Sequence, residues 1–310
     1  MNNFVGKFDD DILKDKKHIH MIGIGGSGMY PLAQILHSKG YYITGSDNNE
    51  TDTLKAVRSM GIEVFLGQSA DNIKGADLII RTAAIMQDNP ELIAANASGV
   101  PVLERSELLG IITKMYSNAV CVSGTHGKTT VTSMITQILK QGGIDITAYI
   151  GGKLPIIVGS GCVGSSETMV CEACEFEDHF LKLYPDIAVV LNVDADHLDY
   201  FGTLDNIKKS FGKFCSMAGK VIANGDDKNT MSALEGIENI ITFGYSDGCE
   251  WQPANVERKN GLLTEFDILH NGELFTHAAL HVPGEHNVLN AVAAAAAAYE
   301  SGADGEMVRN

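Results

Sequence analysis

The sequence has no apolar run long enough to cross a lipid bilayer, which takes about 20 consecutive residues in a helix. Its first 17 residues are polar and charged, and they contain no apolar stretch of the length found in signal peptides. We therefore expect a cytoplasmic protein without a membrane partner.

Basic residues are scarce as well. The 310 residues include 23 Lys and Arg against 39 Asp and Glu, which gives a formal net charge of −16. Such a chain repels phosphate polymers, so we expect no nucleic-acid partner. A nucleotide would have to be held by local donors, by helix N-termini or by metal ions.

The six cysteines do not form a zinc-binding pattern. Only Cys171 and Cys174 make a C-x-x-C pair, and neither a second pair nor a His pair follows at metal-binding spacing. Glu172 and Glu175 are among the acidic neighbours of this pair, which disfavour reactive thiolates. We therefore expect unpaired thiols. Apart from Glu172, the acidic cluster at 172–178 is expected to form a solvated face.

The length predicts two domains, because a single hydrophobic core rarely extends beyond about 250–300 residues. From residue 18 onward, short apolar runs alternate with helical stretches, as in a parallel sheet covered by helices. We predict a Rossmann-like α/β domain over residues 1–115 and a second α/β domain over 116–310. Two Asn-Gly dipeptides, at 260–261 and 271–272, predict hairpins that add three antiparallel strands to the second sheet.

A G-x-G-x-x-G motif, GIGGSG, occupies residues 23–28 between a predicted strand and a predicted helix. Glycines there let the backbone approach a diphosphate, whose charge is met by the helix N-terminus. Asp47 ends the next predicted strand, where such folds place an acid near the nucleoside. The motif alone does not separate a nicotinamide dinucleotide from another diphosphate ligand, or either of them from a tight turn without a ligand.

A shortened P-loop, SGTHGKTT, occupies residues 123–130 after another apolar strand. Its backbone N–H groups would surround phosphates, Lys128 would neutralise the β and γ oxygens, and Thr129 would reach Mg²⁺. Val122 stands where the full G-x-x-x-x-G-K-[ST] pattern has its first glycine. His126 is either a phosphate donor or a turn residue. The second domain is thus predicted to be P-loop ATPase-like and to bind ATP.

Polar residues follow two of the predicted strands of this domain. Glu172 lies in VCEAC, and Asn192, Asp196 and His197 lie in NVDADHLD (192–199). Open α/β sheets bind ligands at the carboxyl ends of their strands, and metal-bound ATP needs oxygen ligands beyond the P-loop hydroxyl. These residues are therefore candidate metal ligands, with an ordinary surface loop as the alternative.

The last predicted helix begins in GEHNVLNA (284–291). His286 lies at its entry, and Asn287 and Asn290 are three residues apart on one face. Alone, this segment is typical of helix capping. Beside the other motifs, it is a candidate for contact with a nucleotide.

Taken in order, SGTHGKTT, a Glu-bearing strand, NVDADHLD and HNVLNA resemble the Mur ligase family of peptidoglycan synthesis. The first domain is similar to the UDP-sugar domain of the family member that adds L-alanine. That similarity lies in GIGGSGM (23–29), GSD (45–47), RTAAI (81–85) and ERSELL (104–109). The resemblance covers nearly the whole chain from residue 18.

The resemblance implies roles for individual residues. It assigns the UDP-sugar to Gly25, Gly26, Ser27, Gly28, Met29, Asp47, Thr82, Arg105 and Glu107. It assigns ATP to Gly124, Thr125, His126, Gly127, Lys128, Thr129, Thr130, His286, Asn287 and Asn290. Catalysis would fall to Lys128, Glu172 and His197, and Mg²⁺ would be held by Thr129, Glu172 and His197.

The implied reaction is the ATP-dependent ligation of L-alanine to UDP-N-acetylmuramic acid through an acyl phosphate. A sister ligase that adds a tripeptide to the same sugar shares nearly all these motifs, and a non-catalytic UDP-sugar or ATP-binding fragment is a further alternative. Folylpolyglutamate-type ligases lack the GIGGSGM domain, and a nicotinamide dehydrogenase has no use for a P-loop. The family's third domain, which receives the amino acid, is expected to be absent from this sequence.

Overall fold

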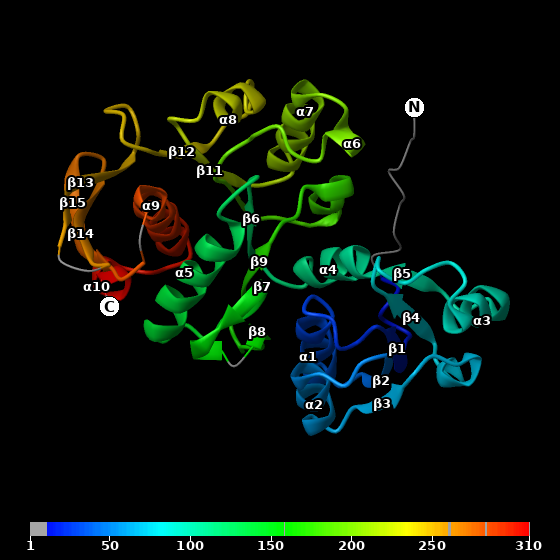
Figure 1. Ribbon diagram of the computed structural model, residues 1–310. Helices are drawn as coiled ribbons and strands as arrows, with labels where there is room; N and C mark the ends of the chain where they lie inside the picture. Colours follow the sequence, from blue (N-terminus) through cyan, green and yellow to red (C-terminus); the bar gives the residue numbers. More distant parts are fainter. Residues whose placement is uncertain (1–10, 158, 260–261, 283, 310) are drawn as a thin grey trace. The chain divides into compact units, whose positions relative to one another are not determined.

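The computed structural model describes residues 11–157, 159–259, 262–282 and 284–309. The chain divides into two compact units (Figure 1). Of the described residues, the first unit comprises those up to Ile112 together with those of Gly151–Val163, and the second comprises Thr113–Ile150 and those from Gly164 onward. The first unit is thus made of two separate stretches of the sequence. The prediction had a single boundary near residue 115 and did not include the second stretch.

The first unit is built on a parallel sheet with the strand order β3-β2-β1-β4-β5. Its strands are β1 (His18–Ile22), β2 (Tyr42–Asp47), β3 (Glu63–Leu66), β4 (Leu78–Arg81) and β5 (Val102–Glu104). The chain moves outward from β1 to β2 and β3, and then returns to the other side of β1 with β4. Ligands bind at such a switch point in open α/β sheets, and the Gly-rich loop starts there, directly after β1.

Helices cover this sheet. They are α1 (Tyr30–Ser38), α2 (Asp52–Ser59), η1 (Ala70–Ile73), α3 (Pro90–Ser98) and α4 (Arg105–Thr113). Two of them start from strong N-caps, since Thr51 accepts the backbone N–H of Leu54, and Asn89 accepts those of Glu91 and Leu92.

The second unit contains a larger mixed sheet. The strands follow one another in the order β15-β14-β13-β12-β11-β10-β6-β9-β7-β8. The bounds are β6 (Asn118–Ser123), β7 (Thr147–Leu154), β8 (Gly159–Cys162), β9 (Thr168–Glu172), β10 (Ile187–Val190), β11 (Lys220–Asn224), β12 (Ile240–Phe243), β13 (Trp251–Arg258), β14 (Thr264–His270) and β15 (Glu273–Leu280). Strand β7 begins in the second unit, but its end and the whole of β8 belong to the first.

The helical elements after β6 differ in length and role. Their bounds are α5 (Lys128–Gln141), η2 (Pro155–Ile157), η3 (Phe176–Lys182), α6 (Leu198–Phe201), α7 (Leu204–Cys215), α8 (Lys228–Ala233), α9 (Glu285–Glu300) and α10 (Gly305–Arg309). Helix α9 buries an unbroken run of alanines, Ala293 to Ala298. These small side chains let α9 approach its neighbour α5 closely (Figure 1).

The predicted antiparallel addition is present, because β13, β14 and β15 pair antiparallel at one edge of the sheet. Asn271 and Gly272 join β14 to β15 with φ values of 53° and 80°. Positive φ at both central positions is what a two-residue hairpin needs, and Asn-Gly adopts it readily. The other predicted Asn-Gly turn, at 260–261, lies outside the described residues.

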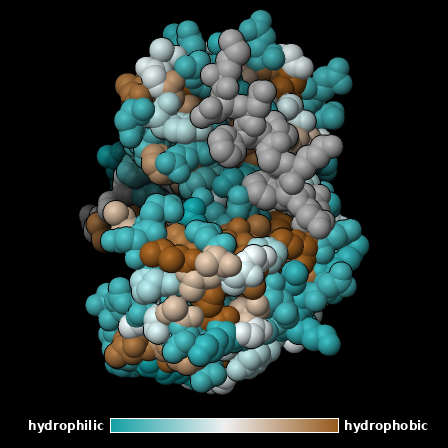
Figure 2. Space-filling model, turned by 90° about the vertical axis from the view of Figure 1, so that its right-hand side faces the viewer, coloured by the Kyte–Doolittle hydropathy of each residue, from teal (hydrophilic) through white to brown (hydrophobic). Residues whose placement is uncertain are grey.

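The α/β class predicted from the sequence is confirmed for both units. The elements that were not predicted include helix α4, the β7–β8 segment, and the short helices α6, α8 and α10. None of the helices in the described part of the chain is long and apolar enough to cross a membrane. The face shown in Figure 2 is mostly hydrophilic, with smaller hydrophobic patches.

Candidate functional site

The Gly-rich loop of the first unit is held by the end of β2. Gly23 and Ile24 donate their backbone N–H groups to the carbonyl of Ser46, and Gly25 donates to Asp47 Oδ2 at 3.0 Å. A Cβ on Gly25 would lie 2.9 Å from that carboxylate oxygen, so a larger residue here would displace the Asp47 side chain from the loop. Asp47 therefore stabilises the loop through this hydrogen bond. Its contact with a nucleoside stays a prediction.

Other predicted UDP-sugar residues have different surroundings. The methyl group of Thr82 lies 2.7 Å from where a Cβ on Gly23 would be, so Thr82 borders the loop. Glu107 instead accepts the backbone N–H of Glu104 at 2.6 Å and caps the first turn of α4, where Arg105 is the first residue. This cap gives Glu107 a structural role, and its contact with a sugar stays a prediction.

A residue that sequence reasoning missed also reaches this loop. Ser160, in β8, is 5% exposed and donates its hydroxyl to the carbonyl of Ser27 at 3.0 Å. The two residues are 133 positions apart. No short-range pattern in the sequence relates them, because the contact depends on the return of segment 151–163 to the first unit.

The P-loop of the second unit connects β6 to α5 and is fixed to the end of β10. The Asn192 amide accepts the backbone N–H of His126 at 2.8 Å and donates to its carbonyl at 3.0 Å. Thr125 donates its backbone N–H to the Asn192 carbonyl. The Thr125 hydroxyl accepts the backbone N–H of Asp194. The backbone of His126 is thus held by the neighbouring strand, which favours its interpretation as a turn residue.

Two glycines give this loop its shape. Gly124 has a φ of 139°, and Gly127, the N-cap of α5, has a φ of 90°. A Cβ on Gly127 would lie 3.0 Å from Asn290 Oδ1 and 3.1 Å from Leu191 Cδ1. The backbone N–H groups of the first helical turn lack intrahelical partners, so the loop leads into an anion-binding helix N-terminus.

Lys128 is the first residue of α5, and its ammonium group is fully engaged. Nζ donates to the carbonyls of Gly124 at 2.5 Å and Thr125 at 3.3 Å, and to the Glu175 carboxylate at 2.9 and 3.0 Å. Glu175 is 3% exposed. The expectation that all of the 172–178 cluster except Glu172 is solvated is therefore wrong for Glu175.

The predicted metal ligands come from three elements. Glu172 ends β9 opposite Val122 of β6, and Thr129 lies in the first turn of α5. His197 is the N-cap of α6, has a φ of 51°, and its ring lies 4.9 Å from that of Phe176. Within the described ranges, no group of three His, Cys, Asp or Glu side chains could hold a metal ion. A metal here would need oxygens from the Thr129 hydroxyl and from bound phosphates.

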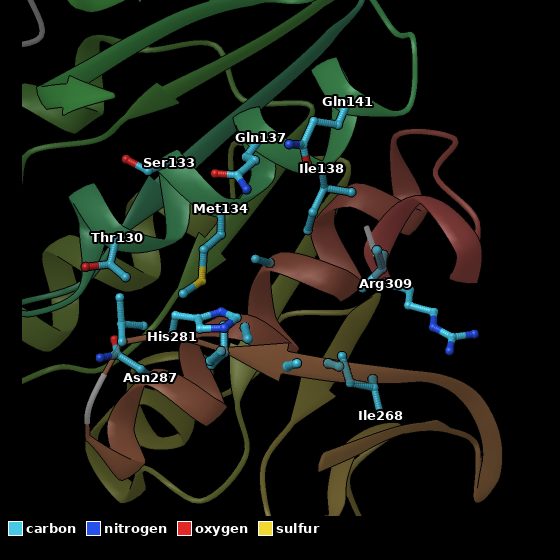
Figure 3. Close-up of a pocket in the computed structure, with 17 residues that line it drawn as sticks. Thr130, Ser133, Met134, Gln137, Ile138, Gln141, Ile268, His281, Asn287 and Arg309 are labelled. Atoms are coloured by element: carbon cyan, nitrogen blue, oxygen red, sulfur yellow. The ribbon is translucent and has the colours of Figure 1, made fainter. Parts of the chain in front are cut away.

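The predicted adenosine residues lie at the start of α9. Asn290 Nδ2 donates to Asn287 Oδ1 at 3.1 Å, and Asn290 adjoins the P-loop at Gly127. Asn287 lines a groove of about 530 Å³, one wall of which is a face of α5 from Thr130 to Gln141 (Figure 3). His286 is exposed. The structure therefore brings Asn290 to the loop and Asn287 to an adjacent groove.

The cysteines form no disulfide. Cys121 and Cys171 are paired residues of β6 and β9, with their sulfurs 3.5 Å apart in the core. The hydrogen bond to Cys171, followed by burial, raises the pKa of the Cys121 thiol well above its usual value. These thiols are core residues and not reactive groups.

Comparison with known proteins places these loops in a family. Residues 122–298 match the Mur ligase middle domain, and residues 18–117 match the domain described as "Mur ligase family, catalytic domain". The chain belongs to the Mur ligase family. The family predicted from the sequence motifs is thereby confirmed.

Several relatives of this Mur ligase chain have names. The UDP-N-acetylmuramate--L-alanine ligases of Caldanaerobacter subterraneus and Acetivibrio thermocellus are each 44% identical to it, over 96% and 94% of the chain. The chain spans 65% and 64% of their lengths.

Two solved ligase structures are also similar to this chain. The UDP-N-acetylmuramate-alanine ligase of Thermotoga maritima has a TM-score of 0.83 and 30% identity, with 95% of this chain and 67% of that chain covered. The UDP-N-acetylmuramate:L-alanyl-gamma-D-glutamyl-meso-diaminopimelate ligase of Neisseria meningitides has a TM-score of 0.84 and 26% identity, with 95% and 96% covered.

Proposed function

We propose that this chain carries the sugar- and ATP-binding parts of an ATP-dependent ligase that joins L-alanine to UDP-N-acetylmuramic acid in peptidoglycan precursor synthesis. The observation that carries the proposal is the P-loop, with Lys128 as the first residue of α5, in a family whose 44%-identical members are named for this reaction. ATP and UDP-linked sugars are cytoplasmic metabolites, so we propose a cytoplasmic location.

In the proposed reaction, the carboxylate of the sugar attacks the γ-phosphorus of ATP, which gives an acyl phosphate and ADP. The amine of L-alanine then attacks the acyl carbon, an amide forms, and phosphate leaves with the electron pair of the broken C–O bond. Phosphoryl transfer depends mainly on positioning and charge neutralisation. Lys128 would supply one positive charge, and the N-terminal turn of α5 would supply backbone donors.

The remaining assignments follow from position. The loop at Gly25, supported by Asp47, would hold the UDP diphosphate. Asn287 and Asn290 would face the adenosine, since one lines the groove beside α5 and the other adjoins the P-loop.

A divalent metal fits part of the predicted set. The Thr129 hydroxyl and the Glu172 carboxylate are the oxygen donors that Mg²⁺ prefers, whereas the imidazole of His197 is a less usual ligand for it. When bound, Mg²⁺ would neutralise phosphate charge that Lys128 alone does not balance.

Replacing Lys128 tests the ATP assignment. Lys128→Ala should weaken Mg·ATP binding about 100-fold, because a charge-assisted contact to phosphate is lost, and should change the Kd for UDP-N-acetylmuramic acid less than about twofold. Lys140→Ala, in the last turn of the same helix, is the matched control and should alter neither affinity. Both are measured by isothermal titration calorimetry. An equal loss of sugar affinity in Lys128→Ala would contradict separate sites for the two ligands.

The amine substrate separates the proposal from its alternatives. In a ligase that joins this chain to the domain that receives the amino acid, L-alanine should increase phosphate release from ATP in the presence of UDP-N-acetylmuramic acid. A response to the tripeptide alone would instead support the sister ligase. The similarity to the Neisseria structure is the observation that favours this alternative. Binding of both nucleotides without any phosphate release would support a non-catalytic module.

A further inference from the structure

The contact between Lys128 and Glu175 has no place in the proposed reaction. An ammonium group has three protons to donate. Here they are directed at two loop carbonyls, those of Gly124 and Thr125, and at both oxygens of Glu175. The ammonium group therefore has no proton left over for a phosphate.

This ion pair is shielded from water on the carboxylate side. The Glu175 side chain is 4% exposed and that of Lys128 is 18% exposed. A buried carboxylate is unfavourable unless it is paired and hydrogen-bonded, so the position of Glu175 depends on the lysine.

The loop that carries Glu175 is held in one conformation by several hydrogen bonds. Glu177 and Asp178 have φ values of 50° and 57°, which residues other than glycine seldom adopt. The chain closes on itself, with Asp178 N–H donating to the Glu175 carbonyl at 3.0 Å and Phe180 N–H donating to the Cys174 carbonyl at 2.8 Å. The Asp178 carboxylate in turn accepts the Tyr200 hydroxyl at 2.9 Å. Such a loop fixes Glu175 at the ammonium group.

Phosphate and Glu175 would compete for the same proton donors. The two carbonyls belong to the P-loop itself and can remain bonded to Lys128 when a nucleotide enters. The carboxylate is an anion, and a second anion at the same ammonium group would be repelled by it. The net charge of −16 supplies no general positive field to offset that repulsion.

We propose that Glu175 is a positioning residue that holds Lys128 in place before a nucleotide binds, and that the β- and γ-phosphates of ATP displace its carboxylate from the ammonium group. This inference rests on the proposed function of the P-loop. Glu175 keeps Lys128 oriented in the empty loop, and its displacement lowers the affinity for every nucleotide that reaches Lys128.

The test compares Glu175→Gln with Glu177→Gln by isothermal titration calorimetry. Both variants remove one negative charge from the same loop, but the Glu177 side chain is 50% exposed and neighbours His179 and not Lys128. In Glu175→Gln the Kd values of Mg·ATP and Mg·ADP should fall about tenfold, because no anion has to be displaced. The Kd of AMP, whose single phosphate does not extend to the lysine, should change less than about twofold. Glu177→Gln should leave all three values unchanged within about twofold.

A purely structural role for Glu175 would weaken nucleotide binding on substitution, so the direction of the change decides. Unchanged or weaker ATP binding in Glu175→Gln, while the wild type binds ATP, overturns this inference and leaves the proposed function standing. If the wild type binds no ATP, the proposed function fails and the inference fails with it. Should Glu175→Gln not fold, Glu175→Asp serves instead. Its carboxylate is one methylene too short to keep both contacts, and it should lower the Kd of ATP about threefold.

Discussion

Gly127 offers a quantitative test of the P-loop geometry. Its φ of 90° is unfavourable for any residue with a Cβ, and an alanine there costs about 1–2 kcal/mol in backbone strain. The added Cβ would also lie 3.0 Å from Asn290 Oδ1 and 3.1 Å from Leu191 Cδ1. Asn290 cannot move without loss, because its amide donates to Asn287. Overpacking of this kind costs about 1–3 kcal/mol more.

Gly143 is a matched control within the same unit. Its φ is 86°, nearly the same as that of Gly127, but no atom lies within 4 Å of where its Cβ would be. Gly143→Ala should therefore cost only the backbone strain of about 1–2 kcal/mol. Gly127→Ala should cost about 2–5 kcal/mol and should also weaken ATP binding, since the loop must open to accommodate the methyl group.

The assay follows from the composition. The protein has a single tryptophan, Trp251, which is completely buried in β13 of the second unit. Urea unfolding monitored by tryptophan fluorescence thus reports the free energy of unfolding of the unit that contains both glycines. If the two variants lose the same free energy within about 0.5 kcal/mol and bind ATP equally well, the close contact of Gly127 with Asn290 is refuted.

Two further predictions concern hydrogen-bonded side chains. Asn192→Ala removes both contacts to the backbone of His126, and it should cost about 1–2 kcal/mol by the same urea assay and weaken ATP binding about tenfold; unaltered ATP affinity would contradict the role of the clamp. Burial alone would raise the pKa of Glu91, but His20 and hydrogen bonds from Ser46 and Asn72 outweigh it and hold the pKa below the usual value. The ionised form therefore stabilises the first unit above about pH 4.3, the ordinary glutamate value, and this contribution is lost as the pH falls through the lowered pKa. Glu91→Gln should cost about 2–4 kcal/mol at pH 7 and much less in acid, measured by hydrogen exchange of β2; a difference that does not change with pH would refute this account.

The chemistry-bearing loops could be predicted because each is a short local pattern. Glycines at 124 and 127, a lysine at 128 and a preceding apolar strand suffice to predict a phosphate-binding turn, and the structure has that turn between β6 and α5. Strand alternation likewise predicted the α/β class, since parallel strands buried on both faces appear as continuous apolar runs.

Glu175 could not be predicted in the same way. Several acids lie within a few residues of it, and which of them turns toward Lys128 depends on the left-handed backbone at Glu177 and Asp178. Residues other than glycine give little sequence signal for that conformation. The β7–β8 segment was missed because its glycine-rich sequence has a low strand propensity, and long-range pairing decides its structure.

The split composition of the first unit has a consequence for biosynthesis. During translation, the residues up to Ile112 emerge from the ribosome well before Gly151–Val163. Until that later segment is made, the carbonyl of Ser27 has no Ser160 hydroxyl to accept, and the outer surface of α1 lacks the strand that packs on it. All five strands of the amino-terminal sheet are then already made, but the packing on α1 is incomplete while roughly the next 40–50 residues are synthesised, about 2–10 s at bacterial elongation rates. During that interval, chaperones would have access to apolar surface that the finished molecule conceals.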